Sequence, residues 1–153
     1  MLLFKSVLVS LITFSGLLLA QDIAPFPPYH EDDSGGVSPM FSESRANSLA
    51  WLTLMDQGVY GATWDEAGSL LKDVIVRRQW VSAMTDLRRP LGYSSMRKIT
   101  KQRTLDGLPY GTKGYFMEII YSTTFWGKGG ATERVIMMYD AYSNWRVISY
   151  SIE

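Results

Sequence analysis

Hydrophobic residues first form one nearly continuous run and then recur at helical spacing. The run fills residues 1–20, where Lys5 is the only charged residue. From Ser42 onward apolar residues return every three or four positions, which predicts helices with one buried face. Ser42 is suited to cap the first helix and Gly58 to end it. We expect three helices, over residues 42–57, 61–70 and 76–88.

After Pro90 the spacing of apolar residues changes from about 3.6 to about 2. Four segments with this alternation predict strands over residues 93–105, 114–126, 131–140 and 144–152. The last three are joined by short connections, which is typical of antiparallel hairpins. The order of elements indicates an α+β fold with three N-terminal helices packed on a curved four-stranded antiparallel sheet. We expect it to form a single domain, residues 42–153.

The alternation also assigns side chains to the two faces of the sheet, if the hairpins place Trp126 opposite Ala131 and Asp140 opposite Asn144. The face beneath the helices then collects Tyr115, Met117, Ile119, Tyr121, Phe125, Ile136, Met138, Ile148, Tyr150 and Ile152. The opposite face also collects apolar residues, although a one-sided sheet is usually polar there. Such a patch usually marks a partner surface. The predicted partner-binding residues, through which we expect a homodimer, are Phe116, Ile120, Val135, Met137, Tyr139 and Trp145.

The N-terminal run has the pattern of a secretory signal peptide, with Lys5 before the apolar stretch and a small residue, Ala20, at the cleavage point. Its strongly apolar part is shorter than the roughly 20 residues of a spanning helix, so we expect no membrane span after cleavage. Residues 21–41 hold four of the 6 prolines and indicate an extended or flexible tether. The protein is therefore expected to be exported, either periplasmic or secreted. His30 with the acids after it is interpreted as part of a solvated tether rather than a metal site.

Composition narrows the possible chemistry. Lysine and arginine total 15, aspartate and glutamate total 15, and this balance disfavours general nucleic-acid binding. With no cysteine and 1 histidine, disulfides, thiol catalysis, cysteine-ligated zinc and paired-histidine metal sites are excluded. We expect no cofactor and no metal, and assign no catalytic residue.

Three local patterns suggest chemistry without establishing it. The stretch from Gly127 to Thr132 looks like a phosphate loop, but a strand follows it where a helix is required, which favours a hairpin turn. Glu118 and Glu133 fall on the same predicted face, with nothing to bring a nucleophile between them. The 5 tryptophans fit ordinary core packing. A helix layer over a curved sheet also leaves room for a cavity that takes a small apolar ligand.

Short motifs occur in a characteristic order along the domain. They are Arg89-Pro90-Leu91-Gly92, Arg97-Lys98, Leu108-Pro109 with Gly114-Tyr115, Thr124-Phe125 with Lys128, Glu133-x-Val135, and Trp145-Arg146-Val147 with Tyr150-x-Ile152, to which Trp51, Trp64 and Trp80 add. In order and spacing these motifs resemble a family of small exported bacterial proteins, the domain of unknown function 4019. The resemblance covers residues 42–153. This chain departs from the family in its longer Pro-rich tether and at Gly129-Gly130.

The resemblance implies an architecture similar to the cystatin-like or nuclear-transport-factor-like α+β folds. That class contains enzymes, ligand-binding proteins and dimerisation modules, so it does not choose among functions. The family brings no established catalytic residues. What the resemblance suggests is a structural ion-pair set around the hairpins, formed by Arg97, Lys128, Glu133 and Arg146.

Our leading hypothesis is an exported, non-catalytic module that binds a partner or a small ligand and dimerises through the outer sheet face. The alternative from another class is a pocket enzyme of isomerase or hydrolase type, with Glu118 or Asp56 as its acid or base. A third hypothesis is a structural accessory of the cell envelope, held by the Pro-rich tether.

Overall fold

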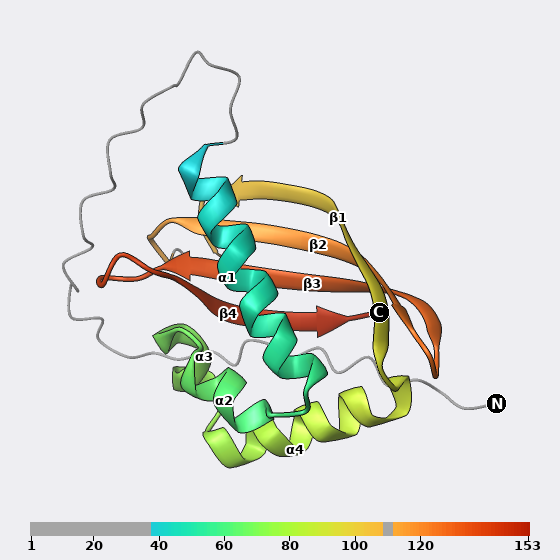
Figure 1. Cartoon of the computed structure of the whole chain (residues 1–153). Helices are drawn as coiled ribbons and strands as arrows, with labels where there is room; N and C mark the ends of the chain where they lie inside the picture. The colour runs from blue at the N-terminus through green and yellow to red at the C-terminus, as the bar shows by residue number, and fades with distance from the viewer. Residues whose placement is uncertain (1–37, 109–111) are drawn as a thin grey trace.

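The computed structural model describes residues 38–108 and 112–153, and it shows helices on one face of a curved sheet (Figure 1). The predicted leader, most of the predicted tether and His30 lie outside the described residues. The helices are α1 (Pro39–Asp56), α2 (Tyr60–Asp65), α3 (Ser69–Val74) and α4 (Arg77–Arg88), followed by a short 3-10 helix η1 (Arg89–Leu91).

Helix α1 begins three residues before the predicted start. Pro39 occupies its first turn, where the missing N–H of proline costs nothing, and Ser38 is the cap residue. The prediction that Ser42 caps this helix is wrong, because its hydroxyl donates to the Pro39 carbonyl within the first turn at 2.9 Å. The helix thus includes the last residues assigned to the tether.

The single helix predicted over residues 61–70 is two short helices, α2 and α3, which meet at Gly68. The Gly68 N–H donates to the carbonyl of Val147 at 2.8 Å. A Cβ at Gly68 would lie only 2.8 Å from Cγ2 of Ile148. Glycine is therefore needed here for the backbone to approach the sheet, and this approach interrupts the helix.

The strands are β1 (Ser94–Leu105), β2 (Phe116–Phe125), β3 (Gly129–Tyr139) and β4 (Trp145–Ile152). They form one antiparallel sheet in the order β1-β2-β3-β4, which confirms the predicted α+β meander. Strand β1 bends strongly after it leaves η1 (Figure 1), and its pairing with β2 shifts register twice. The likeness to cystatin-like or nuclear-transport-factor-like folds stays a prediction.

The predicted register between β2 and β3 is wrong. Ala131 lies opposite Thr123, not opposite Trp126, and β3 already begins at Gly129. Gly129 has φ +82°, a conformation that glycine adopts without strain and that tightens the connection. The shift from Trp126 to Thr123 is an odd number of residues, so the two faces of β3 are exchanged. Val135 and Met137 therefore lie beneath the helices, and Ile136 and Met138 lie on the outer face.

A bulge in β4 returns the side chains at the C-terminal end of that strand to the faces of the sheet that the sequence predicted. Met137 pairs with Val147 but Ile136 pairs with Ser149, so Ile148 is an extra residue in β4. Before the bulge, Trp145 and Val147 face the helices, contrary to the prediction. After it, Tyr150 and Ile152 face the helices as predicted.

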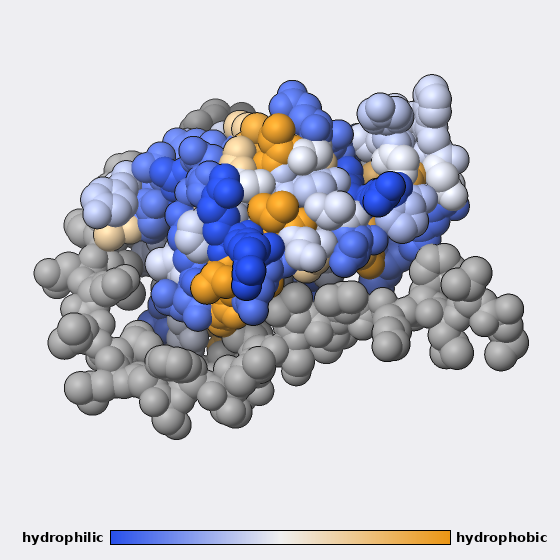
Figure 2. Space-filling view, turned by 90° about the horizontal axis from the view of Figure 1, so that it is seen from below, coloured by the Kyte–Doolittle hydropathy of each residue, from blue (hydrophilic) through white to orange (hydrophobic). Residues whose placement is uncertain are grey.

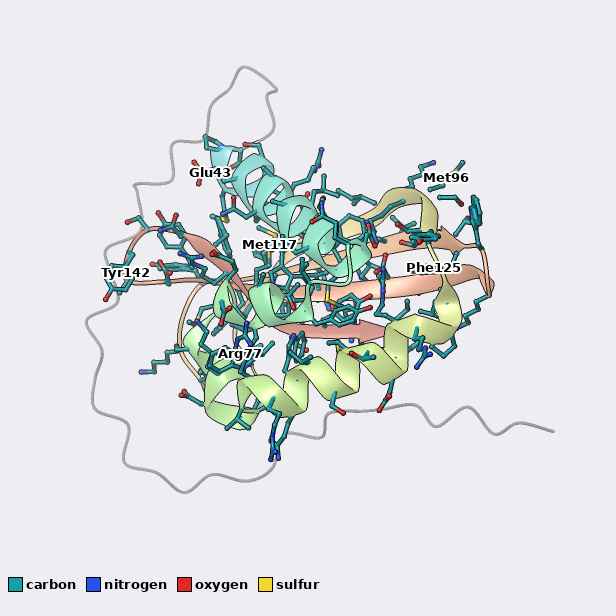
Figure 3. All side chains as sticks on the ribbon, turned by 60° about the horizontal axis from the view of Figure 1, so that its bottom comes forward. Glu43, Arg77, Met96, Met117, Phe125 and Tyr142 are labelled. Carbon is teal, nitrogen blue, oxygen red and sulfur yellow. The ribbon has the colours of Figure 1, made fainter. Side chains whose placement is uncertain are left out.

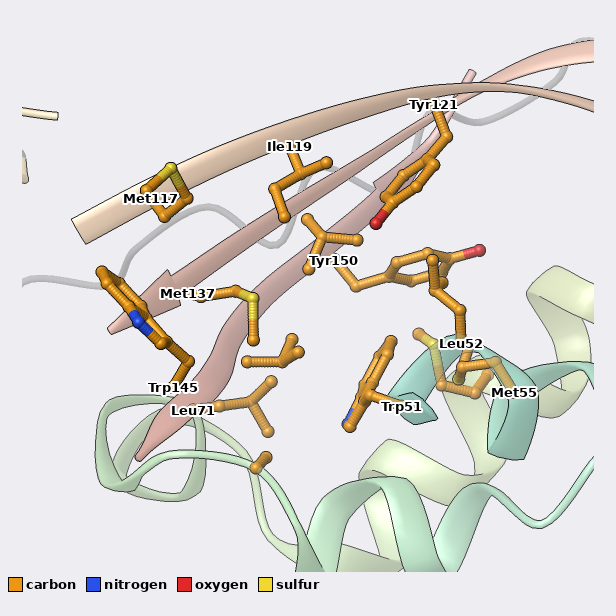
Figure 4. Packing of buried hydrophobic residues seen from close by; sticks show 14 of the residues in the cluster. Trp51, Leu52, Met55, Leu71, Met117, Ile119, Tyr121, Met137, Trp145 and Tyr150 are labelled. Atoms are coloured by element: carbon orange, nitrogen blue, oxygen red, sulfur yellow. The ribbon is translucent and has the colours of Figure 1, made fainter. Parts of the chain in front are cut away.

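The main core lies between the sheet and α1, with aromatic rings at its centre (Figure 4). Trp51 packs at 5.5 Å from Tyr150 and at 6.1 Å from Trp80, measured between ring centroids. Thr63 fixes both indoles, because its carbonyl accepts from Trp51 Nε1 at 2.8 Å and its hydroxyl accepts from Trp80 Nε1 at 2.9 Å. Of the other predicted core residues, Met117, Ile119, Tyr121 and Phe125 are buried, whereas Tyr115 is 40% exposed.

The helical side of the molecule is mostly hydrophilic at its surface. Viewed from below, it shows scattered hydrophobic side chains and no single continuous patch (Figure 2). Within the described residues, no helix combines the length and apolar character that crossing a membrane requires.

Candidate functional site

A pocket of about 420 Å³ opens between α1 and the β3–β4 hairpin, on the helix-covered side of the sheet. We call it the hairpin groove. Its floor is made of four buried side chains: Trp51, Met137, Trp145 and Val147. The rest of its lining, mostly more exposed, consists of Asn47, Ala50, Leu54, Glu66, Asn144 and Arg146. The groove therefore combines an apolar floor with a mainly polar rim.

The floor of the groove is held in place by contacts on both sides. The Asn47 amide donates to the Trp145 carbonyl at 3.2 Å and ties α1 to β4. The Tyr139 ring packs against Trp145 with centroids 5.4 Å apart, in an edge-on arrangement. Trp51 is fixed by its hydrogen bond to the Thr63 carbonyl. These contacts give the aromatic floor a defined shape.

The rim carries the only ionisable groups that line the groove, Glu66 and Arg146. Arg146 contacts Glu66 at 2.7 Å and Asp140 at 3.3 Å, so its charge is already balanced. Neither the Glu66 nor the Asp140 carboxylate is left unpaired as a base. Among the described residues, both ionisable groups of the groove lining are therefore engaged in ion pairs.

At the other end of the same face, four charged side chains form a buried charge cluster: Asp56, Arg88, Arg97 and Glu133. Glu133 accepts from Arg88 at 2.9 Å and from Arg97 at 2.7 Å. Asp56 binds the same two arginines from the end of α1. Two positive and two negative groups cancel within the cluster.

Hydroxyl groups complete the cluster. The Tyr150 hydroxyl donates to Glu133 at 2.6 Å, and Thr123 donates to the same carboxylate. The Arg88 guanidinium also lies 4.7 Å from the centroid of the Phe125 ring. Among the described residues, no buried side-chain nitrogen or oxygen lacks a hydrogen-bond partner. Through these bonds the cluster connects α1 and α4 to strands β1 and β3.

The protonation equilibria of the cluster follow from burial and pairing. Burial by itself would raise the pKa of Asp56, but hydrogen bonds and charge from Arg97, with help from Ser94 and Arg88, hold that pKa below its usual value. Burial and the nearby charge of Glu133 raise the pKa of Tyr150 well above its usual value. Both shifts favour the protonation states that the hydrogen bonds require at neutral pH.

The structure separates the residues of the expected ion-pair set. Arg97 and Glu133 pair within the cluster, and Arg146 pairs at the rim of the groove. Lys128 lies exposed in the β2–β3 connection. The two acids proposed for the pocket-enzyme hypothesis are also engaged in ion pairs. Asp56 pairs within the cluster, and Glu118 pairs on the outer face.

The expected ion-pair set omitted Arg88 and Asp56, although the sequence carries a signal for both. Arg88 follows Met84 and Trp80 at steps of four residues, which places it on the buried stripe of α4. Asp56 follows Leu52 in the same way on α1. A charged residue on an apolar stripe predicts a buried partner.

The six predicted partner-binding residues do not share one face. Val135, Met137 and Trp145 are buried in the core beneath the helices, so their assignment to the outer face is wrong. Tyr139 is half-buried against the same core. Of the six, Phe116 and Ile120 keep the predicted face, and Phe116 is itself buried. The role of the outer face in binding a partner stays a prediction.

The outer face of the sheet has its own ion pairs. The buried carboxylate of Glu118 contacts Arg103 at 2.6 Å and Arg134 at 3.1 Å. Half-buried apolar side chains flank it, among them Ile120 and Ile136. This face is therefore more polar than the sequence predicted.

Comparison with known proteins identifies a family but no characterised relative. Neither the curated proteins nor the solved structures contain a match to this chain. A family model described as "Protein of unknown function (DUF4019)" matches residues 47–150, a span that includes both the hairpin groove and the buried charge cluster. The chain therefore belongs to the DUF4019 family.

Proposed function

We propose that this protein is an exported, non-catalytic module that binds a small ligand in the hairpin groove. The observation that carries the proposal is the combination of an unfilled volume of about 420 Å³ with a buried aromatic floor. Small-molecule sites typically occupy roughly 300–1,000 Å³ and place a few polar groups around an apolar lining. Trp51 and Trp145 supply the flat apolar surfaces.

The rim indicates the kind of ligand. The side-chain amides of Asn47 and Asn144 each donate one hydrogen bond within the protein. Each keeps a second N–H and a carbonyl oxygen at the edge of the groove. The Glu66–Arg146 pair leaves no net charge there. The groove therefore favours a neutral or weakly polar molecule with a flat apolar body and one hydrogen-bonding end.

Fluorescence of N-phenyl-1-naphthylamine, a neutral probe with a flat apolar body and one N–H group, tests the groove in the native chain. We expect saturable enhancement with a dissociation constant on the order of tens of micromolar. Ala50 lines the groove from α1, so Ala50→Trp fills the volume and should weaken binding about tenfold.

The matched control is Ala46→Trp, one turn earlier on α1 and outside the groove lining. This variant should bind the dye as the wild type does. Equal binding by Ala50→Trp and the wild type contradicts the proposal, and so does the absence of enhancement with the native chain.

Export is supported by the sequence pattern of residues 1–20 alone. Expression of the full chain followed by fractionation and N-terminal sequencing tests it. We expect an exported chain that begins at Gln21. A chain that keeps its leader and stays with the cytoplasm contradicts this part of the proposal.

Dimerisation through the outer sheet face is a second candidate. It is favoured by the half-buried apolar side chains of Ile120, Ile136 and Met138 on one face. The Glu118 ion pairs interrupt that surface. Sedimentation of the chain at increasing concentration tests it, and Ile136→Glu should abolish any dimer. A monomer throughout the concentration series contradicts this candidate.

A further inference from the structure

Three large apolar side chains are exposed together at one end of the sheet. Trp126 is 78% exposed, Tyr93 73% and Met96 69%. The Tyr93 and Trp126 rings meet edge to face, with centroids 6.2 Å apart. Met96 pairs with Thr124, two residues before Trp126. We call these three residues the aromatic tip; Figure 3 shows Met96 at this end of the sheet and Tyr142 at the opposite end.

The backbone that carries the aromatic tip is held by specific contacts. The Trp126 N–H donates to the Tyr93 carbonyl at 3.1 Å, and the Gly127 N–H donates to the Leu91 carbonyl at 2.8 Å. A Cβ at Gly127 would lie 2.5 Å from the Pro90 carbonyl oxygen, so only glycine permits this approach. The neighbouring Phe125 is buried, at 1% exposure. The exposed rings are therefore presented by an ordered junction that includes Pro90 and Leu91 of the Arg89-Pro90-Leu91-Gly92 motif.

Three lysines lie on the elements that carry the aromatic tip. Strand β1 contains no acidic residue, and its Lys98 and Lys101 lie on the outer face, opposite Ser122 and Ile120. Lys128 is in the connection that follows Trp126. Within the part of the chain that the structure describes, none of these three lysines has an ion-pair partner. Strand β1 and the connection after Trp126 therefore carry positive charge that no ion pair compensates.

We propose that the aromatic tip and these lysines dock the protein on an anionic phospholipid bilayer. Tryptophan and tyrosine are favoured at the membrane–water interface, because their rings are apolar and their N–H and O–H groups stay hydrated. Lysines within a Debye length of anionic headgroups add electrostatic attraction. The side chains of the tip are largely exposed, which leaves them accessible to a bilayer surface. A second copy is a poor occupant, since a symmetric contact would bring the lysines of both chains together.

The chain has no cysteine, so a single introduced thiol gives a specific label. Gly130 lies opposite Thr124, and a Cβ there meets nothing within 4 Å. We would attach the environment-sensitive fluorophore NBD to Gly130→Cys in the full chain. Ala141→Cys, in the exposed β3–β4 connection, is the control position. Vesicles of equimolar phosphatidylglycerol and phosphatidylcholine are compared with vesicles of phosphatidylcholine alone.

We expect the Gly130→Cys label to shift to shorter wavelength on the anionic vesicles and the Ala141→Cys label to stay unchanged. Trp126→Ala should weaken binding about tenfold, whereas Tyr142→Ala, which removes an exposed aromatic residue at the other end, should leave it unchanged. Lys98→Gln should weaken binding about fivefold, and the exposed Lys113→Gln should not.

The apolar leader is common to all variants, so differences between variants report the aromatic tip. A label that does not shift overturns the proposal. Equal shifts at both positions, or equal shifts on neutral and anionic vesicles, also overturn it. A shift that depends on protein concentration without vesicles indicates self-association and overturns it as well. Circular dichroism of each variant checks that the fold is kept.

Discussion

The two ends of the helix-covered sheet face are built in different ways. At the hairpin groove, buried apolar side chains surround unfilled space, and the charged pair Glu66–Arg146 stays at the rim. At the buried charge cluster, Arg88 and Glu133 lie inside the protein with little solvent contact and full hydrogen bonding.

This difference shows that buried charge by itself does not identify a functional site. A ligand gains little from groups that already satisfy one another, as Arg88, Arg97 and Glu133 do. It gains from an apolar lining beside unfilled space, as at Trp145 and Met137. The groove is the better candidate because its floor is buried yet not filled.

The largest expected effect tests the cluster. Glu133→Gln keeps the shape of the side chain but leaves Arg88 and Arg97 with only Asp56 as a counter-charge. Breaking a buried pair in this way typically costs about 3–5 kcal/mol of unfolding free energy. Urea denaturation measures it. Glu118→Gln is the control, because its arginine partners are about half exposed and the loss should be clearly smaller. Equal losses in the two variants contradict the structural role of the cluster.

A smaller effect is expected near the groove, where packing is decisive. Gly68→Ala places a methyl group 2.8 Å from Ile148 Cγ2 and 3.3 Å from Arg146 Cβ. Overpacking of this kind typically costs about 1–3 kcal/mol. Thermal denaturation measures the loss, and dye binding should weaken with it. Gly130→Ala, which meets no atom within 4 Å, is the control and should be nearly neutral. A neutral Gly68→Ala would show that the close approach is not needed.

Acid should weaken the cluster end through Asp56. Despite its burial, pairing with Arg97 and Arg88 holds the pKa of Asp56 below its usual value, so the folded protein resists protonation more than the unfolded chain. The resulting stabilisation is present above the unfolded pKa, about 4, and is lost as the pH falls through the folded pKa. We expect unfolding free energy, measured by urea denaturation, to fall below about pH 4.

Asp56→Asn should lower stability at neutral pH and reduce its dependence on pH in that acidic range. The exposed Asp86→Asn on α4 serves as the control and should leave the dependence unchanged. An unaltered acid dependence in Asp56→Asn would assign the effect to other carboxylates.

The smallest effect is expected at the rim of the groove. Arg146 and Glu66 are both substantially exposed, so Arg146→Gln should cost less than about 1 kcal/mol. The loss should shrink further at high salt, because exposed charges are screened. Denaturation at low and high ionic strength measures it. A large loss of unfolding free energy that does not depend on salt would mean that the rim pair stabilises the protein as the buried charge cluster does.

The sequence predicted the elements better than their register. Strand positions followed from alternation, but the faces of β3 depended on whether Ala131 met Trp126 or Thr123. That choice rests on the conformation of Gly129, which composition does not reveal. The bulge at Ile148 exchanges the faces of the strand a second time. Tyr150 therefore lies on the predicted face although neither the register shift nor the bulge was predicted.

Only part of the candidate site can be predicted from the sequence. Arg88 and Asp56 sit at buried helical positions, so the cluster was predictable from the stripes of α1 and α4. The groove was not, because it depends on how far α1 stands from the β3–β4 hairpin. Sequence alternation predicts Trp145 and Met137 on the outer face, whereas the observed register places them inside, where they form part of the groove floor.

The Trp51–Trp80 contact has a practical consequence. Two buried indoles, 6.1 Å apart and inclined at 55°, belong to different helices and are joined through Thr63. Aromatic rings held in fixed positions give near-ultraviolet circular dichroism, which is lost with tertiary packing. We therefore expect this signal to fall when α1 and α4 separate. The two tryptophans therefore serve as an intrinsic spectroscopic probe of tertiary structure, which reports loosening of the helix layer without any added dye.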